Sequence, residues 1–139
     1  MSCVSAISAP LTKAQLKEIA NQKFRYTSPA IRPSLLRRLT KMSVDDNFKI
    51  RERAALDYNL PEELQWVLAE DEADTVRACL ARNTTLRYEV MHALAGDAQT
   101  VVRGFLATNS AVPTDIIDDL AENDPDDVVR SLATIAKGI

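Results

Sequence analysis

The sequence contains little glycine, few aromatic residues and almost no cysteine. Only three of its 139 residues are glycine, 5% are aromatic and two are cysteine. The scarcity of glycine and aromatic side chains disfavours a β-rich fold and favours helices. Cys3 and Cys79 have the spacing of neither a metal site nor a disulfide framework. We therefore expect two reduced thiols and no cofactor.

Long apolar runs are absent as well. No stretch approaches the roughly 20 residues of a membrane span, and the first residues lack the positive start and apolar centre of a secretory signal. We therefore expect a cytoplasmic protein without a membrane partner. A hydrophobic fraction of 46% and a charged fraction of 27% are typical of a folded chain, and the length of 139 residues suits one domain.

Charge is distributed unevenly along the chain. Residues 1–53 carry eleven Lys or Arg and four Asp or Glu, a net charge of +7. Residues 54–139 carry six and sixteen, a net charge of −10. Such polarity favours steering of a charged partner or head-to-tail self-association, and the basic half is also a known indication of nucleic-acid contact.

An apolar residue followed by arginine recurs along the chain. The pairs are spaced by 26, 26 and 27 residues and are Ile50-Arg51, Val76-Arg77, Val102-Arg103 and Val129-Arg130. Between them, large apolar residues at i, i+4 and i+8 mark one face of a second helix. These are Leu60, Leu64 and Leu68, then Leu86, Val90 and Leu94, then Val112, Ile116 and Leu120. The leading helix of each unit carries Val76, Cys79 and Leu80, then Val102, Phe105 and Leu106, then Val129, Leu132 and Ala133.

Polar residues separate these helices. Asn83 and Asn109 follow a leading helix at a position suited to a left-handed C-cap. Candidate N-caps precede the apolar residues of each leading helix: Asp74, Thr100, and Asp124 or Asp126. Each unit is therefore predicted to be a pair of short helices.

Self-similarity at this period predicts an all-α fold, a short right-handed α-solenoid or superhelix of stacked helix-pair repeats of about 26 residues. The predicted divisions of this single domain, 1–139, are atypical N-terminal capping helices at 1–49, repeats at 50–75, 76–101 and 102–128, and a truncated final helix at 129–139. In the capping region, Thr12 opens a helix, and Ile31, Leu35 and Leu39 repeat the apolar spacing.

The repeated region resembles a known family. Its short period, Leu-Pro-Glu-Glu-Leu at 60–64, Leu68-Ala69 and Asp71 make residues 50–136 similar to HEAT-like repeats, and more closely to the bacterial leucine-rich repeat variant family. The resemblance covers about two thirds of the chain and implies a helical-repeat fold with a binding role. Members of that family can carry an N-terminal cysteine cluster for an iron–sulfur centre. Because Cys3 is the only cysteine before Cys79, we expect no such cofactor.

The repeated arginines allow two interpretations. They could line a groove and bind phosphates or carboxylates, or they could hold successive units together. Asp71 precedes Arg77 by six residues, and Asp97 precedes Arg103 by the same distance, which favours pairing between a turn and the next helix. We therefore predict structural roles for Arg51, Arg77, Arg103, Arg130, Asp71 and Asp97.

Candidate partner-binding residues occur in two places. The first is a basic cluster that either contacts nucleic acid or forms a solvated face: Arg32, Arg37, Arg38 and Lys41. The second is a set of residues on the second helices that are expected to face a partner: Gln65, Trp66, Arg87 and His92. Trp66 is either an interface anchor or partly buried against the next unit.

The function predicted from these features is binding rather than catalysis. His92 is the single histidine and has no neighbouring ligand or activated nucleophile at a suitable spacing, so we expect neither an enzyme nor a metal site. We predict a non-catalytic protein–protein interaction module, or scaffold, that presents a helical-repeat surface. The alternative is a nucleic-acid-binding HEAT-like repeat protein that uses the basic N-terminal segment.

Overall fold

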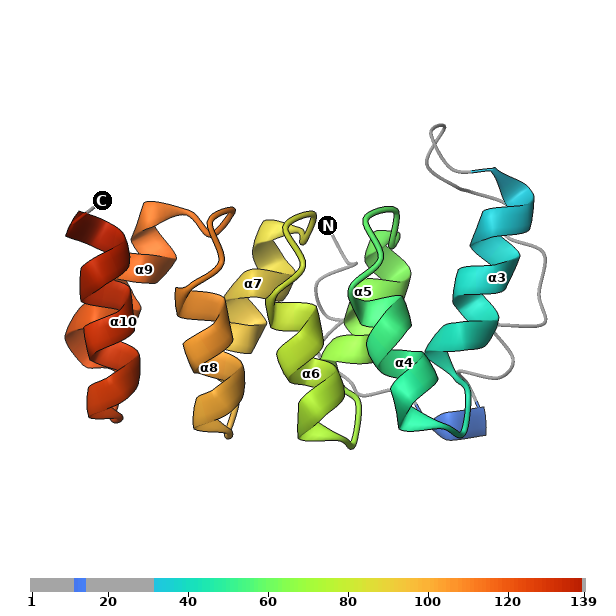
Figure 1. Cartoon of the computed structure of the whole chain (residues 1–139), viewed down its shortest axis with the longest axis horizontal. Coiled ribbons are helices and arrows are strands. Elements are labelled where there is room, and N and C mark those ends of the chain that lie inside the picture. The colour runs from blue at the N-terminus through green and yellow to red at the C-terminus, as the bar shows by residue number, and fades with distance from the viewer. Residues whose placement is uncertain (1–11, 15–31, 139) are drawn as a thin grey trace.

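Helices are the only regular elements in the part of the chain that the computed structural model describes, residues 12–14 and 32–138 (Figure 1). They are α3 (Pro33–Ser43), α4 (Phe48–Ala55), α5 (Glu62–Ala69), α6 (Asp74–Ala81), α7 (Tyr88–Ala95), α8 (Thr100–Ala107), α9 (Thr114–Asn123) and α10 (Asp127–Gly138). The all-α fold class is confirmed. None of these helices is long and apolar enough to pass through a membrane.

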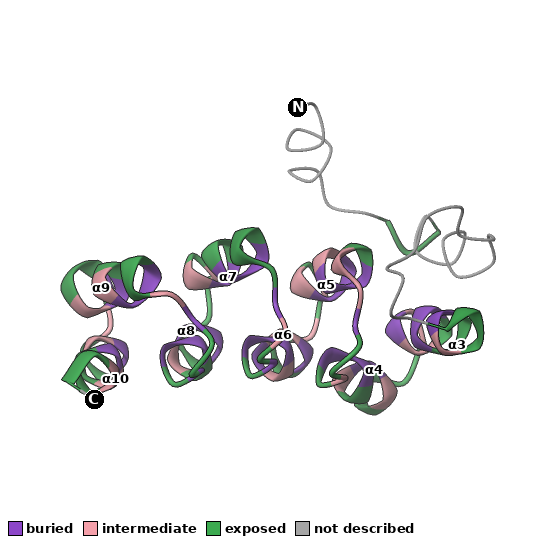
Figure 2. Cartoon of the chain, turned by 90° about the horizontal axis from the view of Figure 1, so that it is seen from above, coloured by how far each residue is buried: buried purple, intermediate pink, exposed green. Residues whose placement is uncertain are grey.

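The helices form two rows that follow the order of the chain (Figure 2). One row, here called the leading row, consists of α4, α6, α8 and α10, and the trailing row consists of α3, α5, α7 and α9. Neighbouring helices pack more extensively within the leading row than within the trailing row. The right-handed superhelical course of the stack stays a prediction.

The core lies between the two rows and continues from one unit to the next. All nine residues of the predicted second-helix stripes are buried. The leading row contributes Val76, Val102 and Val129, none of which is more than 1% exposed. Burial of one such side chain contributes roughly 1.5–3 kcal/mol. Because an isolated helix of the eight residues found in α4, α6 or α8 is not stable in water, stacking stabilises every unit.

One apolar position of the leading helices lies at the edge of the core and not within it. Phe105 is 38% exposed on the outer side of α8, and Cys79 and Leu132 are half-buried at the same position of α6 and α10. The buried residue is the next one along each helix: Leu80, Leu106 and Ala133. Successive residues turn by about 100° around a helix, so the fourth residue after the buried valine returns to the core and the third lies at its edge.

The two ends of the stack also differ from expectation. In α3, Leu36 and Leu39 are buried and Leu35 is only half-buried, while Ile31 lies outside the described residues. Most of the helix predicted to open at Thr12 lies outside them too. The final helix α10 is not truncated: it has 12 residues, against eight in α8, because no breaker precedes Gly138.

Two of the predicted N-caps, Asp74 and Thr100, are displaced by one residue, whereas Asp126, one of the two candidates before the last leading helix, does cap α10. Asp74 is the first residue of α6, and its N-cap is Ala73, which has no capping side chain. Thr100 stands in the same place at the start of α8. The N–H of Ala73 donates instead to the carboxylate of Asp71 at 2.9 Å, which makes a turn just before the helix. An aspartate in the turn thus replaces a cap at the helix end.

Candidate functional site

The repeated arginines form one set of bonds at the edge where the leading helices begin. Arg51 Nε donates to Asp71 Oδ2 at 2.7 Å, Nη2 donates to Oδ1 at 3.2 Å, and Nη1 donates to the carbonyl oxygen of Asp45 at 2.7 Å. We call this arrangement the Arg–Asp lock. It recurs between Arg77 and Asp97 and between Arg103 and Asp124, with Nε to Oδ2 distances of 2.8 and 2.7 Å.

The predicted partners within the locks are wrong by one unit. Spacing pairs Asp71 with Arg77, but the carboxylate of Asp71 binds Arg51, and only its carbonyl oxygen accepts from Arg77, at 2.6 Å. Asp97 likewise offers its carbonyl oxygen to Arg103 at 2.7 Å. The carboxylate of Asp71 already accepts the N–H of Ala73, which turns it toward the preceding leading helix. Each aspartate therefore joins two arginines of successive units.

The arginines of the locks use their N–H groups for hydrogen bonds within the chain. The hydrogen bond to Asp71 raises the pKa of Arg51, and that to Asp124 raises the pKa of Arg103. At the end of the series, Arg130 donates to the carbonyl oxygen of Asp124 at 2.6 Å and pairs with Asp127 of its own helix. The arginines therefore join units, and the hollows that Arg51, Arg77 and Arg103 line are also lined by the aspartates that bind them.

The asparagines after the leading helices also connect neighbouring units. Asn109 Nδ2 donates to the carbonyl oxygens of Ala81 and Asn83 at 2.9 and 2.8 Å, and Asn109 Oδ1 accepts from Ala111 N at 2.9 Å. Asn83 makes the equivalent bonds to the preceding unit. The predicted left-handed caps are wrong, because no described residue has a positive φ. Asparagine is needed at these positions because its side-chain N–H groups donate hydrogen bonds, and not because it tolerates a left-handed backbone.

Gln65 is not a surface residue, contrary to expectation. It is 2% exposed, its Nε2 donates to the carbonyl oxygens of Leu60 and Thr85 at 3.0 and 3.1 Å, and its Oε1 accepts from Arg87 N at 2.9 Å. The side chain therefore holds the start of α7 against α5. Helical spacing alone places Gln65 opposite the stripe, but the connection from the next unit covers it.

The outer side of the trailing row holds the other candidates of the second helices. Arg87 and His92 are exposed, and the Nε of Arg87 lies 3.6 Å from Glu62 Oε1. Tyr88 donates its hydroxyl to Asp115 Oδ2 at 2.5 Å, and this bond raises the pKa of Tyr88. Exposed or half-buried carboxylates dominate this side: Glu62, Glu63, Glu70, Glu89, Asp115, Asp118, Asp119 and Glu122.

Trp66 is half-buried on α5, which agrees with the second of its two interpretations. Its indole Nε1 is buried and has no hydrogen-bond partner among the described residues. The ring packs against the core cluster. Trp66 therefore contributes to packing of the core, and it does not stand out as an anchor on the surface.

The basic cluster lies on α3 at the N-terminal end of the trailing row. Arg37, Arg38 and Lys41 are exposed on the side of α3 opposite its buried residues, and Arg32 is its N-cap. No ion pair joins any of the four to another described residue. The cluster and the carboxylates of α5, α7 and α9 thus give the trailing row a basic end and an acidic remainder.

The outer side of the leading row, here called the leading face, changes character along the stack. The change is seen at four repeat positions of each leading helix. In α4 they are mainly charged, Lys49, Glu52, Arg53 and Leu56. In α6 they are mixed: Thr75 and Arg82 are exposed, Cys79 is half-buried and Ala78 is buried. In α8 and α10 they are mainly apolar: Val101, Gly104, Phe105 and Thr108, then Val128, Ser131, Leu132 and Ile135.

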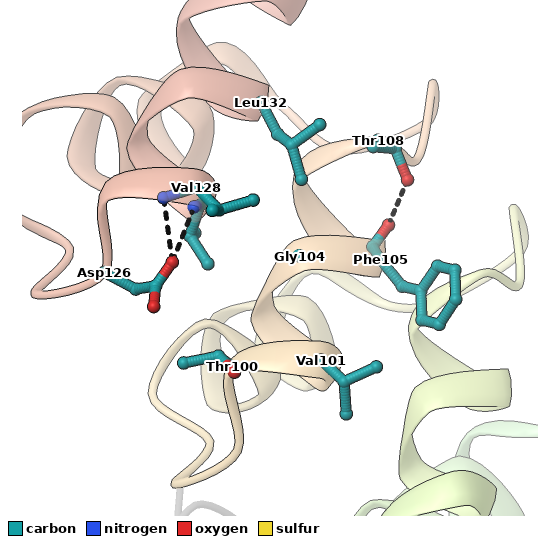
Figure 3. Close-up of a pocket in the computed structure, with 9 residues that line it drawn as sticks. Thr100, Val101, Gly104, Phe105, Thr108, Asp126, Val128 and Leu132 are labelled. Atoms are coloured by element: carbon teal, nitrogen blue, oxygen red, sulfur yellow. Dashed lines mark hydrogen bonds between the residues drawn. The ribbon is translucent and has the colours of Figure 1, made fainter.

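An apolar groove of about 400 Å³ lies between α8 and α10 on this face (Figure 3). Its lining residues are Thr100, Val101, Gly104, Phe105, Thr108, Asp126, Val128, Val129 and Leu132. Leu132 points toward α8 at Gly104, where a Cβ would lie 3.6 Å from Leu132 Cδ1. The missing side chain of Gly104 therefore keeps the floor of the groove open.

The sequence contained the signal for this groove in the apolar residues of the last two leading helices. Val128 and Ile135 are 65% and 61% exposed. Scattered apolar residues on a surface are ordinary, but a cluster around a hollow is typical of a binding site. Aligning the outward positions of the four leading helices reveals the apolar half before any coordinates are known.

The groove borders Arg82, the C-cap of α6. The guanidinium carbon of Arg82 lies 5.5 Å from the centre of the Phe105 ring. Cys79 sits beside them, and burial, followed by the charge of Glu52, raises the pKa of its thiol. A raised pKa keeps the thiol protonated and a weak nucleophile at neutral pH.

The residues that the structure describes include no group of three or more His, Cys, Asp or Glu arranged to hold a metal ion. Comparison of the chain with protein-family models, curated proteins and solved structures gives no match. The resemblance to HEAT-like and leucine-rich repeat variant proteins therefore stays a prediction. The case for a function depends on the surfaces described above.

Proposed function

We propose that the chain is a non-catalytic protein-binding module that receives apolar side chains of a partner protein in the groove between α8 and α10. The observation that carries the proposal is the convergence of Val101, Phe105, Val128 and Leu132 on one groove of the leading face. Matching positions of α4 carry charged residues, so helix packing does not require apolar side chains there.

The size and rigidity of the groove support this function. A cavity of about 400 Å³ lies within the range of ligand pockets and accommodates several apolar side chains. The Arg–Asp locks hold α6, α8 and α10 at fixed spacing, so the groove is formed before a partner arrives. A preformed site loses less conformational entropy on binding. A cytoplasmic location and head-to-tail self-association stay predictions.

Val128→Glu is expected to weaken peptide binding strongly without unfolding the chain. Random peptides displayed on phage and selected on the immobilised chain should be enriched in apolar anchors. The affinity of the enriched peptides should fall about tenfold or more for Val128→Glu, because a carboxylate at the groove cannot be buried without cost. Melting temperature should change little, since Val128 is 65% exposed.

His92→Glu provides the matched control. It introduces the same charge at an exposed helical position of the trailing row. Peptide affinity should be unchanged by this substitution. Failure to enrich any peptide, or equal binding by wild type and Val128→Glu, contradicts the proposed function.

The alternative function, nucleic-acid binding, draws support from the four exposed basic residues at α3. Against it, α3 is a single helix of 11 residues, and the adjoining trailing row is acidic. We expect any retardation of duplex or single-stranded probes in a gel-shift assay to disappear by about 0.15 M salt. A complex that survives this salt and is lost in the double variant Arg37→Glu, Arg38→Glu would establish the alternative.

A further inference from the structure

We propose that the partner of the groove is a protein segment whose apolar anchors are accompanied by carboxylates, and that Arg82 selects for these carboxylates. The inference rests on the proposed function and specifies the chemistry of its partner. It follows from the charges that border the apolar groove on the leading face.

Arg82 stands at the boundary between the apolar and the charged half of the leading face. Its side chain is exposed, and its guanidinium carbon lies 5.5 Å from the centre of the Phe105 ring. An aromatic ring beneath a guanidinium restricts it while leaving its N–H groups available to a carboxylate. An anchor seated beside Phe105 therefore brings the neighbouring residues of a partner within reach of Arg82.

Positive charge continues from Arg82 toward the N-terminal end of the leading face. Lys49 is exposed on α4, and Arg53 is exposed at the position that Phe105 occupies in α8. The one acidic residue among the outward positions of α4 is Glu52, and Lys49 Nζ lies 3.8 Å from its Oε1. The half of the leading face beyond the groove therefore carries an excess of positive charge.

The carboxylates near the groove lie at the opposite edge. Asp126 accepts hydrogen bonds from Val128 N at 2.8 Å and Val129 N at 3.2 Å, so it caps the start of α10. Asp74 is the first residue of α6, whereas Arg82 follows its last residue. Because the leading helices run in the same direction (Figure 1), Arg82 and Arg53 lie toward the edge at which these helices end, whereas Lys49, the second residue of α4, lies toward the edge at which they begin. The acidic residues of the partner are expected beside Arg82 and Arg53.

A basic partner segment fits this surface poorly. It would face Arg82, Arg53 and Lys49 on the leading face, and its charge complement lies on the trailing row, away from the groove. An acidic segment meets both the apolar and the basic half of one face. Opposite potentials across an interface favour association and suppress other partners.

The test compares displayed-peptide selections on wild type and on Arg82→Glu. Peptides enriched on wild type, and dependent on Val128, should contain an excess of Asp and Glu, and those enriched on Arg82→Glu should contain Lys or Arg instead. One enriched peptide and its Asn/Gln counterpart are then compared by fluorescence anisotropy. The acidic peptide should bind wild type about tenfold more tightly than the counterpart, and this preference should vanish for Arg82→Glu.

Arg87→Glu is the control, because it reverses the charge of an exposed arginine on the trailing row. It should leave the preference for the acidic peptide intact. Peptides that depend on Val128 but show no acidic excess, or an unchanged preference in Arg82→Glu, overturn this inference while the proposed function stands. Peptides that do not depend on Val128 overturn both. Single-stranded DNA that displaces the acidic peptide from wild type, but not from Arg82→Glu, overturns the assignment to a protein partner.

Discussion

Replacement of Arg103 by Met is expected to lower the free energy of unfolding by about 3 kcal/mol. The substitution removes a guanidinium that is 9% exposed and leaves the carboxylate of Asp124, which is 2% exposed, without its partner. It also removes the bond to the carbonyl oxygen of Asp97. For a chain of this size the melting temperature should fall by roughly 10 °C, as measured by circular dichroism or calorimetry.

Two further variants test whether the unpaired carboxylate of Asp124 causes the loss of stability in Arg103→Met. In Arg103→Met combined with Asp124→Asn, the amide can still accept the N–H of Asp126, but no buried charge is left unpaired, so part of the lost stability should return. Arg82→Met, at an exposed arginine, should change stability by less than about 0.5 kcal/mol. If Arg103→Met melts at the wild-type temperature, the lock has no structural role.

Asn109→Ala is expected to cost about 2–4 kcal/mol. The side chain is 8% exposed, and its loss deprives the carbonyl oxygens of Ala81 and Asn83 of donors and Ala111 N of an acceptor. A buried polar group left without a partner costs more than an average hydrogen bond contributes. Urea unfolding of the variant should show a lower midpoint with an unchanged slope.

Asn109→Asp distinguishes the contribution of the N–H donors to stability from the contribution of the side-chain shape. A carboxylate has the same outline and can still accept from Ala111 N, but it cannot donate to Ala81 or Asn83, so stability should not recover. Asn59→Ala removes the same amide from an exposed position in the turn between α4 and α5, and it should have little effect. Equal midpoints for Asn109→Ala and Asn59→Ala would show that the bonds between units contribute nothing to stability.

These bonds have a consequence for binding. Arg103 and Asn109 belong to opposite ends of α8, and each connects α8 with a neighbouring unit. Arg103 binds Asp124 in the turn before α10, whereas Asn109 binds the end of α6, so α8 is fixed at both ends and α10 is joined to it at the edge where the leading helices begin. We expect weakened peptide binding in Arg103→Met to accompany lost stability, whereas Val128→Glu should weaken binding alone.

Patterns within one helix were predicted well. Residues at i, i+4 and i+8, such as Leu86, Val90 and Leu94, are all buried, because helical geometry by itself places them on one side. The pattern did not distinguish Phe105, an apolar side chain at the edge of the stripe that is 38% exposed, from the buried residues beside it. Aligning Phe105 with Arg53, its equivalent in α4, would have identified an outward position.

Partners in different units were predicted poorly. Arg77 was paired with Asp71 because the two are six residues apart, yet the carboxylate that it binds belongs to Asp97, twenty residues later. Gln65 was placed on the surface, yet it accepts from Arg87 N in the next unit. Such pairs depend on how one helix pair is positioned over the next, and local spacing carries no information on that.

The sequence by itself determined that this chain is helical, where most of its helices lie and which residues form its core, because these properties follow from the periodicity of apolar side chains along single helices. Only the tertiary structure decided which polar groups join successive units and where an apolar groove opens, because both depend on the packing of helices that are distant in the chain. The positions of Arg82 beside Phe105 and of Leu132 opposite Gly104 are of this second kind.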